Sequence, residues 1–352
     1  MPHTRWTLAQ AFSSYYRLKR VTAELHYESA AFASSCRSSF PARIRNQWTA
    51  AVTEPAYPPP YRGRFAPTPS GPLHAGSLLT ALASWLDAHA AAGAWLLRID
   101  DLDIARCPPG QTDLILRQLE AHGLEWDATP VRESQHHDRY VQALESLQTA
   151  GCLYRCDCTR ATLHRNGLHG PDGLVYDGRC RNRPAAAIGH HAALRLRSGE
   201  GRVNFDDGIQ GCMAREIETE IGDFTVRRSD GIFGYQLACA VDEAEMHITH
   251  VVRGADLVGS TFSQHIVQKA LGLTPPRYAH VPILLGMDGN KLSKQNHAAA
   301  LDSATPGRNL YIALQQLHQH PDPALERETP KVILAWARAH WRADRIPRSA
   351  TI

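Results

Sequence analysis

The sequence contains little cysteine and no long run of apolar residues. Eight cysteines among 352 residues are too sparse for a disulfide scaffold. No stretch provides the roughly 18 uncharged apolar residues that a membrane helix needs, and the closest, 79–97, is broken by Asp87 and His89. We therefore expect a protein of the reducing cytoplasm with no membrane partner.

An excess of charge of one sign is also absent. The formal net charge is +3 at pH 7, and residues 1–57 carry seven Lys or Arg and three Glu, which leaves about −1 for residues 58–352. Any nucleic acid must therefore bind a local patch rather than a generally basic surface. With 43% hydrophobic and 21% charged residues, the composition excludes a wholly disordered or collagen-like chain.

Breaks in the sequence pattern divide the chain into segments. Residues 1–57 have no clear apolar period, and we expect an extension of unknown structure that ends at the prolines of 58–60. We expect residues 58–150 and 223–300 to form the two halves of one catalytic domain. An inserted subdomain would occupy 151–222, and a short helical region would occupy 301–352.

The apolar spacing predicts an α/β fold. Strands are predicted over 61–66 and 94–99, and they alternate with helices over 75–91, 111–122 and 138–149. This order predicts a parallel sheet with crossover helices. Further strands are predicted over 193–197, 224–226, 247–252 and 281–285. Further helices are predicted over 260–271, 307–318 and 329–342.

Residues 64–77 form the most informative stretch, Arg-Phe-Ala-Pro-Thr-Pro-Ser-Gly-Pro-Leu-His-Ala-Gly-Ser. Its prolines predict a turn between the first strand and the first helix. The amide groups at a helix N-terminus attract anions, and Gly76 would let a nucleotide approach the backbone closely. His74 can donate to a phosphate oxygen. The alternative interpretation is a tight turn with a solvated histidine.

A second basic segment lies far downstream. Lys291 and Lys294 belong to the run Lys-Leu-Ser-Lys, which follows an apolar stretch and a Gly-containing loop. Two lysines at this spacing can fold over a triphosphate and stabilise the leaving pyrophosphate. The alternative is a solvated basic loop.

Together the two segments resemble the paired signature motifs of class I aminoacyl-tRNA synthetases. The runs at 97–103, 235–238, 252–257 and 291–296 are similar to the glutamyl-tRNA synthetase lineage, in the same order. The resemblance covers about residues 61–300 and implies a Rossmann-like catalytic domain. It implies that ATP, with Mg²⁺, binds at His74, Gly76, Ser77 and Lys294. It gives the catalytic role to His74, Gly76, Lys291 and Lys294.

A glutamate substrate needs cations for its carboxylates and an anion for its ammonium group. The resemblance places the following residues around bound L-glutamate: Arg64, Phe65, Ala66, Pro67, Thr68, Asp100, Tyr235 and Arg253. The alternative is that Arg64 and Arg253 are structural partners of Asp101, Asp103 or Asp256.

Two residues depart from the pattern of the lineage. Asp100 stands where glutamate is common, and Cys239 stands where asparagine is common. An aspartate is one methylene shorter, and a thiol is a poor substitute for an amide. Both changes predict weaker binding of glutamate than in a standard synthetase.

Clustered cysteines indicate a metal site. Cys156, Cys158 and Cys180 offer three thiolates, and zinc takes four tetrahedral ligands. Tyr176, His164 and His169 are candidates for the fourth ligand, and three reduced, inert cysteines are the alternative. In the lineage the pattern Cys-x-Cys…Tyr-x-x-x-Cys selects Tyr176. The resemblance thus implies one structural Zn²⁺ in an inserted subdomain that faces tRNA.

The resemblance also implies the reaction. The α-carboxylate of glutamate attacks the α-phosphate of ATP and gives glutamyl-adenylate, a step that needs positioning rather than a general base. Because 58 residues follow Lys294, we expect no large anticodon-binding domain. This truncated form implies activation without tRNA and transfer to the queuosine base at the wobble position of tRNA(Asp), whose anticodon stem-loop a monomer would bind. The alternatives are a shortened synthetase that charges a tRNA 3′ end and a non-catalytic tRNA-binding paralogue.

Overall fold

A computed structural model describes residues 60–286 and 299–352 of the protein. Lys291 and Lys294, together with the extension over 1–57, lie outside the described residues. Among the residues that are described, no helix is long and apolar enough to cross a membrane.

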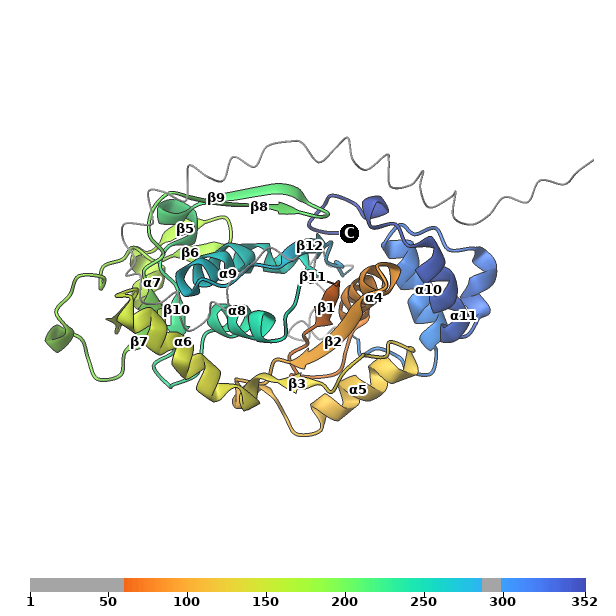
Figure 1. The fold of residues 1–352 in the computed structure, drawn as a ribbon, viewed down its shortest axis with the longest axis horizontal. Helices are drawn as coiled ribbons and strands as arrows, with labels where there is room; N and C mark the ends of the chain where they lie inside the picture. Colours follow the sequence, from red (N-terminus) through yellow and green to blue (C-terminus); the bar gives the residue numbers. More distant parts are fainter. Residues whose placement is uncertain (1–59, 287–298) are drawn as a thin grey trace, which may run out of the picture. The chain divides into compact units, whose positions relative to one another are not determined.

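Parallel strands form the centre of the described chain (Figure 1). One group has the order β1–β2–β3 and the other pairs β11 with β12, with every pairing parallel. The two groups meet where the Thr249 amide donates to the Arg62 carbonyl at 3.0 Å. The strands are β1 (Arg62–Phe65), β2 (Ala94–Ile99), β3 (Val131–Arg132), β11 (His250–Gly254) and β12 (Arg277–Val281). The two groups of strands therefore join at β1 and β11.

Helices connect and cover these strands. They are α4 (Ala75–Ala90), α5 (Gln111–Ala121), α6 (His137–Thr149), α8 (Tyr235–Glu245), α9 (Val258–Leu271), α10 (Pro306–Gln316) and α11 (Pro330–His340). The helices predicted from apolar spacing begin and end within two residues of those observed. Two helices, α7 (Arg160–Asn166) and α8, were not predicted.

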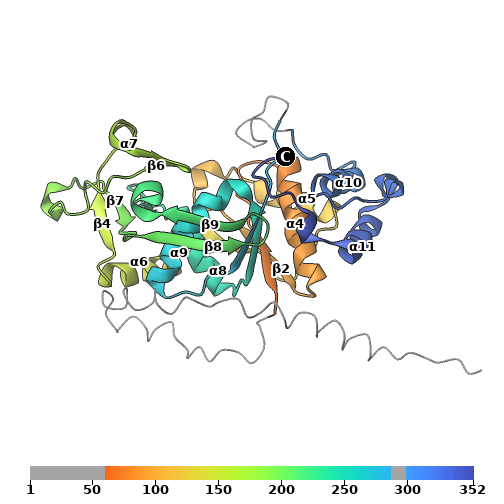
Figure 2. The ribbon, with the colours of Figure 1, turned by 90° about the horizontal axis from the view of Figure 1, so that it is seen from above.

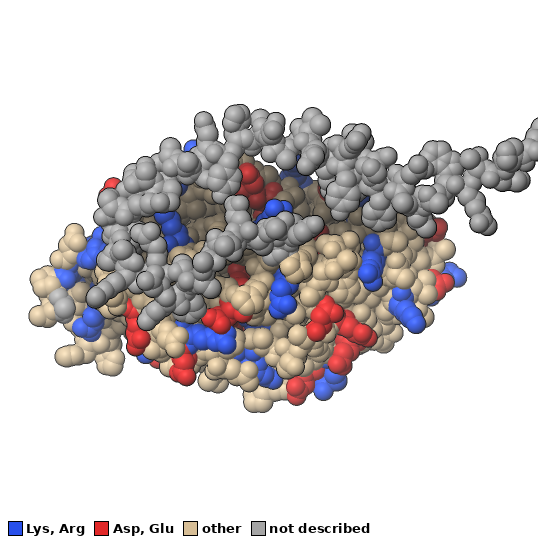
Figure 3. All heavy atoms as spheres, viewed as in Figure 1, with Lys and Arg blue, Asp and Glu red and all other residues tan. Residues whose placement is uncertain are grey.

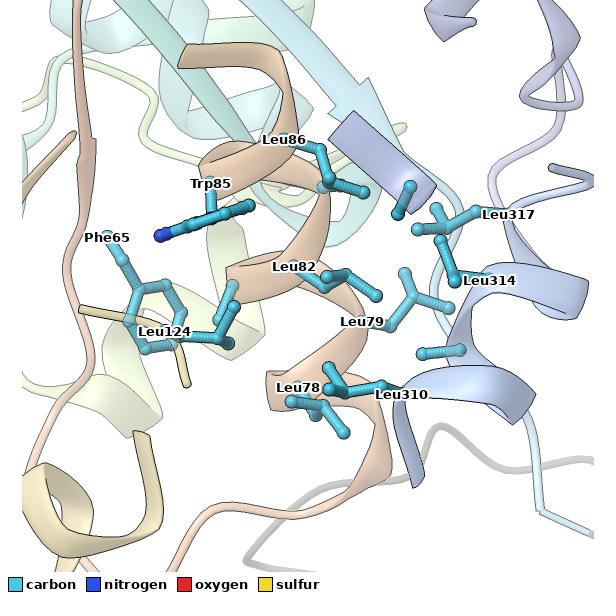
Figure 4. Close-up of a cluster of buried hydrophobic side chains, with 14 of the residues drawn as sticks. Phe65, Leu78, Leu79, Leu82, Trp85, Leu86, Leu124, Leu310, Leu314 and Leu317 are labelled. Atoms are coloured by element: carbon cyan, nitrogen blue, oxygen red, sulfur yellow. The ribbon is translucent and has the colours of Figure 1, made fainter. Parts of the chain in front are cut away.

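Helix α4 is buried between the sheet and the C-terminal helices because its apolar residues form two stripes. Figure 4 shows Leu79 and Leu82 directed toward Leu314 of α10, whereas Trp85 lies on the side of Phe65. All five side chains belong to one buried cluster. This packing holds the start of α4, and hence His74, at a fixed place beside the sheet.

The segment between the two halves is mostly antiparallel. Strand β7 (Ala193–Leu196) lies between β4 (Leu153–Cys156) and β10 (Thr225–Arg227), and helix α7 (Arg160–Asn166) follows β4. There are two hairpins, β5 (Leu168–Gly170) with β6 (Gly173–Val175), and β8 (Arg202–Asp207) with β9 (Gly211–Glu216). Figures 1 and 2 both place β4, β7 and α7 at the opposite end of the described chain from α10 and α11.

The strand predicted over 281–285 is wrong beyond its first residue. Strand β12 ends at Val281, and the residues that follow pair irregularly with the last residues of the chain. The Ile283 amide donates to the Ala350 carbonyl at 2.9 Å, and the Ile352 amide donates to the Ile283 carbonyl at 3.0 Å. An apolar run of this kind predicts a strand of the sheet, but here its partner is a distant segment that periodicity cannot reveal.

Candidate functional site

The charged residues predicted to bind glutamate lie in or directly after parallel strands, and the predicted tyrosine begins a helix. Arg64 lies in β1, Asp100 follows β2, Arg253 lies in β11 and Tyr235 begins α8. The Tyr235 residue is 37% exposed, but its hydroxyl lies among buried groups. The pKa of this hydroxyl is raised, first by burial and then by Cys239 and Asp100, while Arg253 and Arg64 oppose the shift. These groups therefore lie within electrostatic reach of one another, where parallel α/β sheets usually bind ligands.

Arg64 is paired with a carboxylate that lies outside every sequence motif of the predicted site. Its Nη2 donates to Glu243 Oε1 at 2.8 Å, and both side chains are buried. Burial alone would raise the pKa of Glu243, but Arg64, Arg98 and Arg253 hold it below its usual value. The pair leaves the buried Nε of Arg64 without an acceptor in the described part of the chain.

Arg253 is held by neutral groups. Its Nε donates to His280 Nε2 at 3.1 Å, and its Nη2 donates to Thr261 Oγ1 at 2.6 Å and to Gln264 Oε1 at 2.9 Å. Within residues 60–286 and 299–352 no carboxylate forms an ion pair with it, and its buried Nη1 has no partner. A planar guanidinium with an unused N–H suits an incoming carboxylate.

Asp100 is engaged by its own strand. Arg98 Nε and Nη2 donate to its two carboxylate oxygens at 2.7 and 3.2 Å, and Nη2 also contacts Cys239 Sγ at 3.1 Å. The pKa of Asp100 is raised because burial outweighs the effect of Arg98. Cys239, which replaces an expected amide, is thus a weak acceptor for the arginine that fixes Asp100.

Glu133 adds a second carboxyl group beside Asp100. Its Oε1 lies 3.8 Å from Arg98 Nε and, although buried, has no hydrogen-bond partner among the described residues. Burial, reinforced by Asp100 and opposed by Arg98, raises the pKa of Glu133 to about 9. The two carboxyl groups and the thiol of Cys239 approach within 4.8 Å of one another, and the guanidinium of Arg98 is the cation that lies beside all three.

The turn after β1 brings residues 66–68 beside Asp100, since the Asp100 amide donates to the Pro67 carbonyl at 3.2 Å. The turn is completed by the Ser70 amide, which donates to the Thr68 carbonyl at 2.9 Å. The Phe65 side chain, in contrast, is buried in the core and stacks on Trp95. Of this run, Phe65 therefore has only its backbone available to a ligand.

His74 caps the N-terminus of α4, and Gly76 and Ser77 lie in the first turn. His74 Nδ1 accepts from the Ser77 amide at 3.3 Å. In the neutral ring the proton then resides on Nε2, which becomes a donor. The predicted phosphate-binding histidine is thus held in the tautomer that this role requires.

Gln118 on α5 connects the start of α4 with the chain that follows the lysine segment. Its Oε1 accepts from the Leu73 amide at 2.8 Å, and its Nε2 donates to the Leu301 carbonyl at 3.3 Å. The Leu301 amide also donates directly to the Leu73 carbonyl at 2.8 Å. Leu301 therefore lies beside Leu73, the residue that precedes His74. Lys291 and Lys294 themselves are not described.

The predicted metal ligands also come together. The sulfur atoms of Cys156, Cys158 and Cys180 all lie within 4.8 Å of one another, and the hydroxyl of Tyr176 lies 3.4 Å from Cys156 Sγ and 3.8 Å from Cys158 Sγ. His164 and His169 do not belong to either cluster of metal-ligating side chains found in the described chain. Three thiols and a phenol in this arrangement suit a closed tetrahedral site.

Residues 61–308 match the family "tRNA synthetases class I (E and Q), catalytic domain". The chain is 47% identical over 292 residues to the glutamyl-Q tRNA(Asp) synthetase of Ectopseudomonas mendocina, which covers 83% of this chain and 97% of that protein. It is 45% identical to the protein of that name from Thiobacillus denitrificans, which covers 81% of this chain and 94% of that protein.

The chain belongs to this class I synthetase family. It is a ligase of the aminoacyl-tRNA synthetase type. The fold agrees, because the crystal structure of glutamate-tRNA synthetase from Elizabethkingia anophelis matches with a TM-score of 0.67 and 22% identity. That match covers 83% of this chain and 68% of the other. On the coloured part of the face in Figure 3, basic and acidic side chains of the synthetase are interspersed.

Several site residues of this synthetase were missed in the sequence. Arg98, Glu133, Asp242 and Glu243 were not singled out, yet Asp242 accepts from His136 Nδ1 and from the Tyr140 hydroxyl, both at 2.7 Å. Part of the signal was present. Positions 235, 239, 242 and 243 share one face of a helix, so recognising α8 would have placed both acidic residues beside Tyr235.

Proposed function

We propose that this synthetase activates L-glutamate with ATP, without tRNA, and transfers the glutamyl group to the queuosine base at the wobble position of tRNA(Asp). The amino-acid assignment rests on one observation. Two buried guanidinium groups, those of Arg64 and Arg253, each have an N–H without an acceptor, and both act on the hydroxyl of Tyr235. The name shared by the relatives, glutamyl-Q tRNA(Asp) synthetase, supports the acceptor.

In the first step an α-carboxylate oxygen of glutamate attacks the α-phosphorus of ATP, and the bond to pyrophosphate breaks. The attacking carboxylate is already ionised, so no general base is needed. Arg64 and Arg253 would bind the carboxylates of glutamate, Tyr235 would orient it, and Asp100 would accept from its ammonium group. These contacts accelerate the reaction by positioning.

The charge that develops on the phosphates needs donors. His74 Nε2–H and the amides of Gly76 and Ser77 are the groups available at the start of α4. Lys291 and Lys294 are assigned to the leaving pyrophosphate on their sequence alone. Mg²⁺, when bound with ATP, would neutralise phosphate charge.

We further propose one structural Zn²⁺ per chain, held by Cys156, Cys158, Tyr176 and Cys180. The four side chains come from β4, the residue after β6 and the turns that follow each of them. The ion would hold these turns together. With four protein ligands the site leaves no position for a substrate, so its role is structural.

Transfer of labelled glutamate to tRNA(Asp), with and without queuosine, tests the acceptor. We expect label only on queuosine-containing tRNA, and also on an anticodon stem-loop fragment that lacks the 3′ end. A requirement for the 3′ end would favour the shortened synthetase. Glutamate-dependent ATP–pyrophosphate exchange tests activation, and its absence both with and without tRNA would favour the non-catalytic paralogue.

A further inference from the structure

A buried aspartate–histidine pair lies behind Arg253. Asp207, the last residue of β8, and His280 of β12 have fully buried side chains, and Asp207 Oδ2 lies 2.5 Å from His280 Nδ1. The other oxygen of Asp207, Oδ1, accepts three backbone amides: Ile209 at 3.0 Å, Gln210 at 2.9 Å and His280 at 3.0 Å. The two oxygens of this carboxylate thus have separate tasks.

These contacts determine the protonation of His280. Burial alone would raise the pKa of Asp207, but its bond to His280 holds the pKa below the usual value, so Asp207 is an acceptor. Burial lowers the pKa of His280, with Asp207 opposing and Arg253 assisting the shift. The ring is therefore neutral and carries its proton on Nδ1. Its unprotonated Nε2 faces Arg253 Nε at 3.1 Å and Thr261 Oγ1 at 3.1 Å.

We propose that Asp207 and His280 are positioning residues for substrate binding: they fix the acceptor that orients Arg253, so that Nη1 of this arginine is directed at a substrate carboxylate. The inference rests on the proposed function, in which Arg253 binds L-glutamate. Neither residue touches the substrate in this proposal. Asp207 also fixes the turn of the β8–β9 hairpin, so one carboxylate stabilises both this hairpin and the amino-acid site.

The substitution Asp207→Asn tests this idea with little change in size. Three backbone amides need an acceptor at the position of Oδ1, so the amide oxygen of asparagine is held there. Its NH₂ group then faces His280 Nδ1, which must accept, and the ring proton moves to Nε2. His280 Nε2–H would then donate to Thr261 Oγ1, which lies 3.1 Å away, and Arg253 Nε–H would lose its acceptor, so the guanidinium is no longer held in place.

Two substitutions of His280 form a matched pair. A glutamine can bring its oxygen to the place of Nε2 and keep an acceptor for Arg253, whereas an asparagine reaches only the place of Nδ1. In H280N we expect the KM for glutamate to rise about tenfold or more, as expected when a charge-assisted contact is lost. In H280Q the rise is smaller. D207N should resemble H280N, and the KM for ATP should stay within about twofold of wild type in all three.

The measurements use the full chain. Glutamate-dependent ATP–pyrophosphate exchange gives both KM values, and nitrogen NMR of labelled histidines reports the tautomer of His280, which we expect to switch in D207N. D322N is the control, since Asp322 also caps a turn but is exposed and contacts the Ala324 amide; its KM values should equal those of wild type.

The proposal is overturned if D207N switches the tautomer and keeps the wild-type KM for glutamate, or if the KM values for glutamate and ATP rise together. Should D207N fail to fold, equal KM values for glutamate in H280N and H280Q overturn it. Failure of the proposed function is distinguishable, because the wild-type chain would then show no exchange while the tautomer of His280 stays measurable.

Discussion

Arg64 and Glu243, which are 179 residues apart, form a buried ion pair 2.8 Å long between β1 and α8. The pair connects the first strand of the parallel sheet with a helix from the later part of the chain. It also fixes a guanidinium whose Nε stays available inside the site. The pair is thus both a structural link and part of the candidate glutamate site.

Breaking this pair is expected to destabilise the fold. Glu243→Gln leaves Arg64 buried without its counter-charge, and the free energy of unfolding should fall by about 3 kcal/mol. Urea unfolding measures the change. Glu245→Gln is the control, because Glu245 lies on the same helix and pairs with the exposed Arg139, where a loss below about 1 kcal/mol is expected. Equal losses in both variants would contradict the importance of the buried pair.

Arg253→Ala should weaken glutamate binding more than ATP binding. Loss of a charge-assisted contact costs about 1.5–3 kcal/mol, so the KM for glutamate should rise about tenfold to a hundredfold. ATP–pyrophosphate exchange at varied glutamate and varied ATP measures both constants. Arg277→Ala, at the exposed start of β12, is the control and should leave both unchanged. A similar rise for both substrates would indicate a purely structural role of Arg253.

Glu133 should make stability depend on pH. Its pKa is about 9 in the folded chain, whereas in the unfolded chain the pKa of this carboxyl group returns to the ordinary glutamate value of about 4.3. The folded state is thus favoured at low pH, and the contribution is lost as pH rises toward 9. Relative to wild type, Glu133→Gln should gain stability steadily from pH 5 to pH 9.

Urea unfolding of both proteins at pH 5, 7 and 9 checks this prediction. Glu120→Gln removes an exposed carboxyl group on α5 and should show no such trend. A difference between Glu133→Gln and wild type that is constant with pH would refute the assignment.

Two substitutions of His74 separate its structural contact from its predicted contact with phosphate. Asparagine is a good N-cap and should preserve the stability of α4, whereas alanine should cost about 1 kcal/mol. Both variants lose the Nε2–H donor, so exchange activity should fall in both, by about a hundredfold if the donor acts on developing charge. If exchange activity instead falls only in the variant that loses stability, so that H74N stays near wild type, His74 has no role in binding phosphate.

Cys158→Ser should release the proposed zinc. Elemental analysis of the purified protein should find about one zinc per chain in wild type and much less in the variant, and limited proteolysis should cut the 151–222 segment faster. Cys212→Ser is the control, because Cys212 is exposed and outside the cluster. An unchanged zinc content in Cys158→Ser would eliminate this site.

The sequence predicted those elements whose apolar residues recur on one face. Helix α4 is an example, because its leucines repeat at helical spacing and meet the sheet on one side and α10 on the other. Helix α8 was missed since residues 237–243 are all buried, and a segment that is buried all round shows no period. The β8–β9 hairpin was missed as well, although it supplies Asp207.

In the candidate site, the predictions that came from local motifs are those the structure brings together: Arg64, Asp100, Tyr235 and Arg253. Their supporting partners were not predicted. Glu243 and His280 are distant in sequence from the arginines they contact, and only the folded chain shows which buried donor meets which acceptor. Local motifs therefore identify groups that face a ligand better than groups that hold those side chains in place.

The bridge made by Gln118 has a consequence for comparing family members. The side-chain amide of Gln118 lies on a helix that carries neither signature motif. It connects Leu73, the residue before His74, with Leu301, which follows the lysine segment. A different residue at position 118 would thus change how firmly these two distant segments are held together. Such a change would be mistaken for neutral drift if only the motifs themselves were inspected.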